Sequence, residues 1–112
     1  MASCIFCKIV AGEIPATRLA ETDQCLAFRD INAQAPTHIL VIPKQHIDSM
    51  NDVTDTALMG AMTAMAQSIT KSEGIAASGY RLVVNTGADG GQMVQHLHLH
   101  ILAGRKMKWP PG

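Results

Sequence analysis

Long apolar runs are missing from this 112-residue sequence, and none approaches the ~18–20 residues that a helix needs to cross a bilayer. Residues 1–11 lack a basic region followed by an apolar stretch and a small-residue cleavage site, so no secretory signal is visible. Charged residues are also scarce, at only 16% of the sequence, and neither sign dominates, because nine Lys and Arg balance nine Asp and Glu. Without a basic surface, we expect neither a nucleic-acid nor a membrane partner.

Cysteine is equally sparse, and the three present, Cys4, Cys7 and Cys25, do not describe a disulfide framework. Their number is odd and no signal peptide accompanies them. We therefore expect a cytosolic protein. So small a chain can also diffuse into the nucleus where the cell has one. Hydrophobic residues at 47% argue against disorder, and the length predicts one domain over residues 1–112. Cys25 is expected to be a buried strand residue.

The first half of the chain patterns as a short helix followed by strands. A short amphipathic segment, residues 4–11, places Ile5 and Ile9 on one helical face and is broken by Gly12 and Pro15. Strands are then predicted over three ranges, with a hairpin turn at 22–24 between the first two: 17–21, 25–29 and 38–43. The third range is almost continuously apolar, which is typical of a central strand covered on both faces.

One long helix is the clearest element of the second half. Thr54 is its predicted cap, Asp55 suits the first turn, Lys71 suits the last turn and Gly74 supplies the stop. Its apolar face steps along the sequence by four, three and four residues: Leu58, Met62, Met65 and Ile69. Methionines can mark a promiscuous binding surface, but this spacing favours core packing.

Two more strands are predicted after that helix, over residues 80–85 and 96–102, with a loop at 86–92 between them. Strands thus lie on both sides of one long helix in the sequence. This order predicts an α+β fold with a largely antiparallel sheet.

Histidine alternates with aliphatic residues in the last predicted strand, at His96, His98 and His100. On a strand all three imidazoles project from one face, with Cα atoms about 6.5–7 Å apart, while the aliphatic residues pack on the other face. A solvated polar face is the plainest explanation, but Thr, Lys or Glu would serve there equally well. Two chemical interpretations remain: a metal site such as zinc, or a nucleophilic imidazole that attacks phosphorus.

The glycine-rich segment 85–92 favours phosphate chemistry. It contains three glycines, which let backbone N–H groups crowd around an anion. Glycine-rich turns are common, so this segment alone is a weak indication of a phosphate site. Its position directly beside the histidines strengthens that indication.

The segment 90–102 resembles the signature of the histidine triad (HIT) family, in which three histidines alternate with hydrophobic residues. Further segments are similar to the Hint branch of that family, and together they span nearly the whole chain: 5–10, 13–15, 27–31, 35–44 and 109–112. The resemblance implies a five-stranded antiparallel sheet with one long and one short helix, joined into a ten-stranded sheet in a homodimer. It also implies purine nucleoside phosphoramidase activity.

In the implied reaction His98 attacks the α-phosphorus of an adenosine or guanosine phosphoramidate, or of an acyl- or aminoacyl-adenylate. The amine leaves, and water then releases the nucleoside monophosphate, AMP or GMP. The resemblance places His100 and His38 beside His98, and Asn85, Gln92 and the backbone near Gly91 around the phosphate. No cofactor is needed for this chemistry.

The resemblance also implies an apolar purine slot, formed by Ile5, Phe6, Ile9, Phe28 and Ile31. Asp30 matches the acid that accepts hydrogen bonds from the ribose hydroxyls, and Trp109 matches a tail that reaches the partner's site. From the residues alone, apolar side chains of this kind are more often core than pocket, and Asp30 equally suits a turn.

Met93 departs from the family pattern, because Hint-type hydrolases commonly carry a polar residue such as serine directly after Gly-Gly-Gln. Methionine donates no proton to a leaving amine. This departure keeps a rival function open, that of a regulatory nucleotide-binding or scaffolding protein with little turnover.

Cys4 and Cys7 have the spacing of half a tetrahedral zinc site. Resemblance to HIT proteins with a Cys-x-x-Cys implies His46 and His96 as the other two ligands of a structural zinc. Free thiols and redox chemistry are alternatives, although no thioredoxin-like context surrounds the pair. A third function is a zinc-dependent hydrolase that uses all three strand histidines. It fits the glycine-rich segment 85–92, called the glycine loop below, less well.

Overall fold

The computed structural model describes residues 3–112. Five strands form one sheet in which every neighbouring pair is antiparallel and the order is β1-β2-β3-β5-β4. Along the chain the elements are α1 (Ile5–Val10), β1 (Arg18–Glu21), β2 (Cys25–Arg29), β3 (Thr37–Pro43), the 3₁₀ turn η1 (Met50–Asp52), α2 (Ala57–Ser72), β4 (Tyr80–Val83), α3 (Gly87–Gly90) and β5 (Leu99–Ala103). The predicted five-stranded α+β fold is confirmed.

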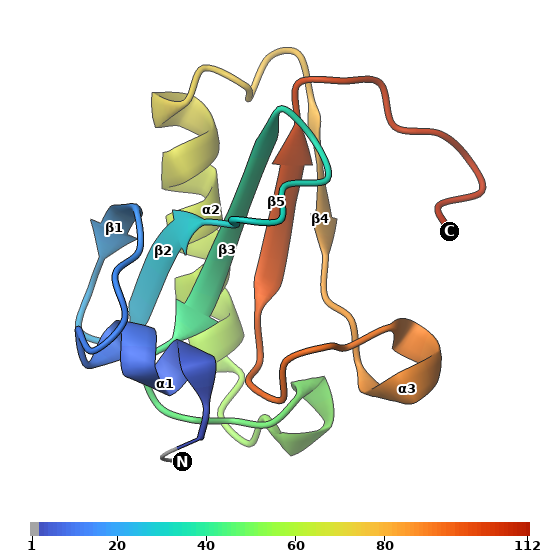
Figure 1. Cartoon of the computed structure of the whole chain (residues 1–112). Coiled ribbons are helices and arrows are strands. Elements are labelled where there is room, and N and C mark those ends of the chain that lie inside the picture. Colours follow the sequence, from blue (N-terminus) through green and yellow to red (C-terminus); the bar gives the residue numbers. More distant parts are fainter. Residues whose placement is uncertain (1–2) are drawn as a thin grey trace.

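The two faces of the sheet are covered by different helices, as Figure 1 shows with α2 behind the sheet and α1 across its front. On the α2 side, Met62, Met65 and Ile69 pack against Ile39, Val41 and other strand residues. On the α1 side, Phe6 and Ile9 pack against a smaller cluster that includes Phe28 and Ile42. The predicted two-sided cover of β3 and the core role of the helix methionines are therefore confirmed. No helix of the described chain is long and apolar enough to span a membrane.

Some boundaries differ from the sequence prediction. The long helix begins at Ala57, so Thr54 is not its cap; instead the carboxylate of Asp55 accepts a hydrogen bond from the backbone N–H of Ala57. Its end is as predicted, since Gly74 follows with a φ of +73°, which glycine adopts without strain. The segment expected to be only a loop at 86–92 contains the short helix α3. In α1 the buried face is Phe6 and Ile9, and Ile5 is exposed.

The most consequential difference concerns the last strand, which begins at Leu99 and not at residue 96. His96 and His98 therefore lie in the irregular segment that leads into β5, and only His100 belongs to a strand. The alternation persists nevertheless, because Leu97, Leu99 and Ile101 are buried on the α2 side. His96 and His98 instead contact Phe6 on the α1 side.

Candidate functional site

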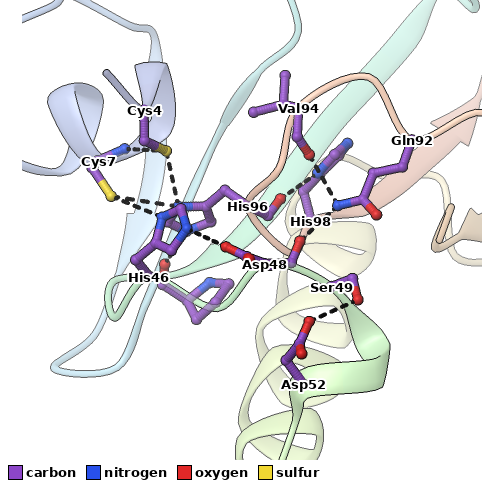
Figure 2. A network of polar contacts seen from close by, with 11 residues as sticks. Cys4, Cys7, His46, Asp48, Ser49, Asp52, Gln92, Val94, His96 and His98 are labelled. Carbon is purple, nitrogen blue, oxygen red and sulfur yellow. Dashed lines mark hydrogen bonds and ion pairs between the residues drawn. The ribbon is translucent and has the colours of Figure 1, made fainter. Parts of the chain in front are cut away.

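Four potential metal ligands converge beside α1 (Figure 2). Cys4 caps α1, Cys7 lies in its first turn, His46 follows β3 and His96 precedes β5. Their ligand atoms all lie within 4.8 Å of one another. Nδ1 of His96 is 3.3 Å from Sγ of Cys4, and Nδ1 of His46 is 3.3 Å from Sγ of Cys7. The structure thus brings together the four residues expected around a zinc ion.

Both imidazoles of this cluster are held in the form that a metal ligand requires. Nε2 of His96 lies 2.8 Å from the carbonyl oxygen of Pro43, which can only accept, so the proton resides on Nε2 and the Nδ1 lone pair faces the cysteines. His46 is oriented in the same way, because its Nε2 lies 2.6 Å from Oδ1 of Asp48. Two thiolates and two oriented imidazoles are a donor set that suits tetrahedral zinc.

Sequence reasoning did not identify Asp48 as part of this cluster. Its spacing of two residues from His46 is the one signal that pointed to it, since a carboxylate often orients a ligating imidazole. Without a cation the thiol form of Cys7 is favoured, because burial, and then the neighbouring Cys4, raise the pKa of Cys7. A bound dication would reverse that effect by favouring the thiolates.

Among residues 3–112, one hydrogen bond to the backbone orients His98. Its Nδ1 lies 2.7 Å from the carbonyl oxygen of His96, so Nδ1 carries the proton and Nε2 carries the free lone pair. The side chain is buried, with its ring 5.2 Å from that of Phe6 and 4.8 Å from that of His100, between centroids. A lone pair held in this way is the requirement for a nucleophilic imidazole.

His38 and His100 form a second chain of ordered protons. The backbone N–H of Gln34 donates to Nδ1 of His38 at 3.0 Å, so neutral His38 carries its proton on Nε2. That Nε2 lies 2.8 Å from Nδ1 of His100, which must then accept. Neutral His100 therefore holds its proton on Nε2. This atom is buried and has no hydrogen-bond partner among the described residues.

Burial keeps both of these imidazoles neutral. It is the main cause that lowers the pKa of His100 to about 4, with smaller contributions from His98 and His38. Burial also lowers the pKa of His38, against the opposing effect of Asp30, whose Oδ2 lies 3.3 Å from Nε2 of His38. At neutral pH the pair therefore offers a neutral N–H donor next to His98.

This burial predicts a loss of stability in mild acid. A histidine whose folded-state pKa lies below its unfolded value of about 6.5 takes up protons preferentially in the unfolded chain. The destabilisation therefore begins as the pH falls through about 6.5 and continues towards the folded pKa of about 4 for His100. Between pH 7 and pH 5 we expect the melting temperature to fall by roughly 5–10 °C.

Thermal melts of the parent and of His100→Gln, in matched buffers, would measure this effect. The variant should lose less stability than the parent over the same interval, because it lacks one of the imidazoles whose pKa is lowered in the folded chain. Equal acid sensitivity of the two proteins would contradict the assignment, and any loss of metal in acid affects both alike.

The glycine loop is closed by the side chain of Gln92. Its Oε1 accepts from the backbone N–H of Gly87 at 3.1 Å, and its Nε2 donates to the carbonyl oxygens of Asp48 at 2.7 Å and Val94 at 3.0 Å. In this structure the amide of Gln92 is therefore hydrogen-bonded to backbone groups. Its expected contact with phosphate stays a prediction. Gly91, at a φ of +77°, takes a left-handed conformation that few other residues adopt.

The residues expected around a nucleoside are divided by the structure. Phe6, Ile9 and Phe28 are buried in the α1-side cluster, and the rings of Phe6 and Phe28 meet edge to face with centroids 5.5 Å apart. The remaining members of the set are more accessible: Ile5, Ile31, Met93 and Trp109 are exposed, and Asn85 is half-buried. Figure 1 shows the tail that carries Trp109 extending away from the sheet.

Asp30 takes the turn role that its position allowed. Its Oδ1 accepts from the backbone N–H of Asn32 at 2.8 Å. Its second oxygen faces His38. A contact with ribose is compatible with this geometry and stays a prediction.

The three histidines near the end of the chain do not meet around one ion. Among the described residues, the groups able to hold a metal place His96 with the cysteines, and His100 with His38 and Asp30. The geometry therefore separates a metal-ligand cluster from a histidine pair with ordered protons, and it disfavours a hydrolase that uses all three on zinc.

The pattern of the HIT domain matches residues 11–107, so the chain belongs to the histidine triad family. An uncharacterized HIT-like protein of Synechococcus elongatus is 52% identical in an alignment of 110 residues that covers 96% of each chain. The crystal structure of a HIT family hydrolase from Legionella pneumophila superposes with a TM-score of 0.95 at 53% identity, over 98% of this chain and 100% of that one. The histidine triad nucleotide-binding protein of Candida albicans matches at 32% identity and a TM-score of 0.86, over 96% of this chain and 83% of the other.

Proposed function

We propose that this chain is a Hint-branch purine nucleoside phosphoramidase that works through a covalent nucleotidyl-His98 intermediate. The observation that carries the proposal is the pairing of a free Nε2 lone pair on His98 with a buried N–H on His100 next to it. The similarity to a HIT family hydrolase and to a histidine triad nucleotide-binding protein supports the same class of chemistry.

The first step is attack of Nε2 of His98 on the α-phosphorus. The P–N bond to the amine breaks, its electron pair stays on the amine nitrogen, and that nitrogen takes a proton from bulk water. As the new P–N bond forms, the imidazole becomes cationic, and the carbonyl of His96 stabilises this charge because it accepts the Nδ1 proton at 2.7 Å. His100 donates its Nε2 proton in a hydrogen bond to a phosphoryl oxygen.

In the second step water attacks the same phosphorus and loses a proton to bulk water, and the bond to Nε2 of His98 breaks with its electron pair returning to Nε2. The products are a nucleoside monophosphate and the regenerated imidazole. Neutral imidazole is a good leaving group from the cationic nucleotidyl-imidazole, so one difficult displacement is replaced by two easier ones. Asp30 and the apolar residues of the α1 side are proposed to hold ribose and purine.

A homodimer completes this proposal. Trp109 is 82% exposed and lies on a tail directed away from its own sheet, which suits a contact with a partner subunit. Tyr80 and Leu82 are likewise exposed on β4, an edge strand of the sheet. Continuation of the sheet into ten strands across this region is part of the proposal.

Structural zinc is the proposed cofactor. Cys4, Cys7, His46 and His96 would hold it, and its chemistry would be to tie three chain segments together. Reduced thiols, as expected in the cytosol, are a condition for binding. Apart from water, the catalytic steps above use only groups of the chain itself.

Hydrolysis of a fluorogenic adenosine phosphoramidate tests the proposed function. We expect multiple turnovers by the purified protein, and quenching with denaturant at alkaline pH, where a P–N bond to imidazole is stable, should trap a protein species heavier by one adenylyl group. If AMP binds but neither turnover nor the adenylylated species is seen, the regulatory nucleotide-binding function replaces the enzyme.

Met93 offers a test of how the leaving amine is protonated. Met93 is 92% exposed and lines a pocket of about 400 Å³ together with Ile5 and Val94. Because a thioether has no proton to donate, this side chain supplies no donor to the amine. Met93→Ser should raise kcat by about 10-fold for substrates with basic, poorly leaving amines and leave good leaving groups nearly unchanged. Equal turnover by parent and variant across the whole series would show that another group, such as His100, protonates the amine.

A further inference from the structure

The metal-ligand cluster and the proposed catalytic residues are connected through short contacts on three sides. We propose that metal binding at Cys4, Cys7, His46 and His96 preorganises His98 and the glycine loop, so that metal and nucleotide strengthen each other's binding. The nucleotide half of this inference rests on the proposed function, whereas the structural half concerns the chain alone.

The shortest connection passes through His96 itself. Its imidazole faces the cysteines through Nδ1, while its carbonyl oxygen accepts the Nδ1 proton of His98 at 2.7 Å. A rotation of the His96 backbone would therefore move the hydrogen bond that orients His98. Fixing the imidazole of His96 in a metal site restrains that backbone.

The second connection joins the segment of His46 to the glycine loop, as Figure 2 shows from Asp48 to Gln92. Asp48 holds His46 with its carboxylate and accepts the amide of Gln92 with its carbonyl oxygen, at 2.6 and 2.7 Å. The other end of that amide receives the N–H of Gly87 at 3.1 Å. One side chain thus spans the distance between a metal-ligand segment and the loop proposed to hold phosphate.

Further backbone contacts make the two segments move together. The N–H of Leu97 donates to the carbonyl of Ile47 at 2.7 Å, and Nε2 of His96 donates to the carbonyl of Pro43 at 2.8 Å. These bonds join the chain after β3 to the chain before β5. Neither segment is part of a regular strand where His46 and His96 lie, so their alignment depends on such individual contacts.

The third connection is apolar and comes from α1. Phe6 lies between the two cysteines in the sequence, and its ring packs edge-on against His96 at 5.8 Å and His98 at 5.2 Å, between centroids. A helix of six residues is too short to be stable alone, so its position depends on what fastens it to the sheet. Ligation through Cys4 and Cys7 would fasten it, and with it the wall against which His98 rests.

Reciprocal titration tests the coupling. Zinc affinity is measured by competition with a chelator with and without AMP, and AMP affinity is measured by calorimetry with and without zinc. Linkage requires the two ratios to be equal, and we expect each to be at least about 5-fold. Ratios within about twofold of one, in a protein that binds both, would overturn the inference.

Gln92→Leu is the diagnostic variant, because Gln92 contacts neither a cysteine nor a metal-facing imidazole nitrogen. Its zinc affinity without AMP should stay within about twofold of the parent, while the coupling ratio falls towards one. Gln95→Leu, which changes an exposed glutamine of the same segment, is the matched control and should keep the full ratio. A Gln92→Leu protein that retains the parent ratio would remove Gln92 from the connection.

A readout without nucleotide separates this inference from the proposed function. Adding zinc should slow amide exchange in residues 87–92 and shift the imidazole ¹⁵N resonances of His98, even if AMP binds to neither form. If AMP fails to bind but these changes occur, only the proposed function fails; if they are absent, the coupling fails.

Should the metal-free protein lose its fold in circular dichroism, the protein loaded with Co²⁺ takes its place. AMP should then alter the visible absorption of the cobalt in the parent and in Gln95→Leu, and alter it less in Gln92→Leu. An unchanged spectrum in an AMP-binding parent would overturn the coupling.

Discussion

Replacing His98 with alanine is expected to lower kcat for an adenosine phosphoramidate by at least about 10⁴-fold. The reason is that His98 is the side chain whose unprotonated Nε2 is turned towards the proposed reaction centre by a backbone acceptor. Alanine removes the nucleophile itself, so direct attack of water on the phosphoramidate is all that remains. The measurement is steady-state turnover of the fluorogenic substrate by parent and variant, each checked for folding by circular dichroism.

The matched control for this experiment is His100→Ala. His100 supplies a hydrogen-bond donor and not the nucleophile, so a smaller loss of about 10²–10³-fold is expected. The adenylylated protein should still form in His100→Ala and be absent from His98→Ala. Retention of more than about 1% of the parent turnover by His98→Ala would show that the chemistry does not pass through this residue.

AMP binding decides what a negative result means. If the parent and His98→Ala are both inactive while the parent binds AMP, the fold serves nucleotide binding without hydrolysis. If the parent is active and only His98→Ala is inactive, the loss belongs to chemistry, provided that the variant retains its fold.

The alternation of histidine with aliphatic residues correctly placed the histidines on the side of the chain opposite Leu97, Leu99 and Ile101. It could not show that the strand begins only at Leu99, since a side-chain period of two survives in an extended segment outside the ladder. The consequence is that His96 turns to the cysteines of α1 while His100 pairs with His38. Adjacent positions in one motif therefore serve two different sites.

The orientation of each imidazole was beyond the reach of sequence reasoning. It depends on the N–H of Gln34 for His38 and on the carbonyl of Pro43 for His96, and backbone groups carry no residue-specific signal. Gln92 is a similar case, because an amide beside glycines suits phosphate contact and loop closure equally well. Long-range contacts decide between such roles, and periodicity reports only local structure.

The apolar residues near the site illustrate the same limit. The resemblance places Phe6 and Phe28 in a purine slot, their apolar character favours a core, and the structure buries them against the sheet. The two roles are compatible, because the ring of Phe6 also touches His98. A residue at the edge of a core becomes the wall of a site wherever the core meets a polar group.

Removing metal from the metal-ligand cluster is expected to lower the melting temperature by roughly 10–20 °C. This figure corresponds to about 4 kcal/mol, the stabilisation given by a ligand present at about 1,000 times its Kd. The loss should centre on α1, since its six residues depend on tertiary contacts, and its N-cap Cys4 and its own Cys7 supply the thiols of the metal-ligand cluster. Melting with and without a strong chelator, together with amide exchange of residues 5–10, measures both the size and the place of the effect.

Elemental analysis of protein purified without chelator should accompany those melts and find about one zinc per chain. Cys7→Ser should carry no zinc, melt near the chelated parent and show no further response to chelator, because serine does not replace a thiolate ligand. Cys25→Ala is the matched control: this cysteine is buried in the α2-side core, so zinc content should be unchanged. A parent that contains no metal and melts at the same temperature with and without chelator would instead assign Cys4 and Cys7 to free thiols packed against His46 and His96.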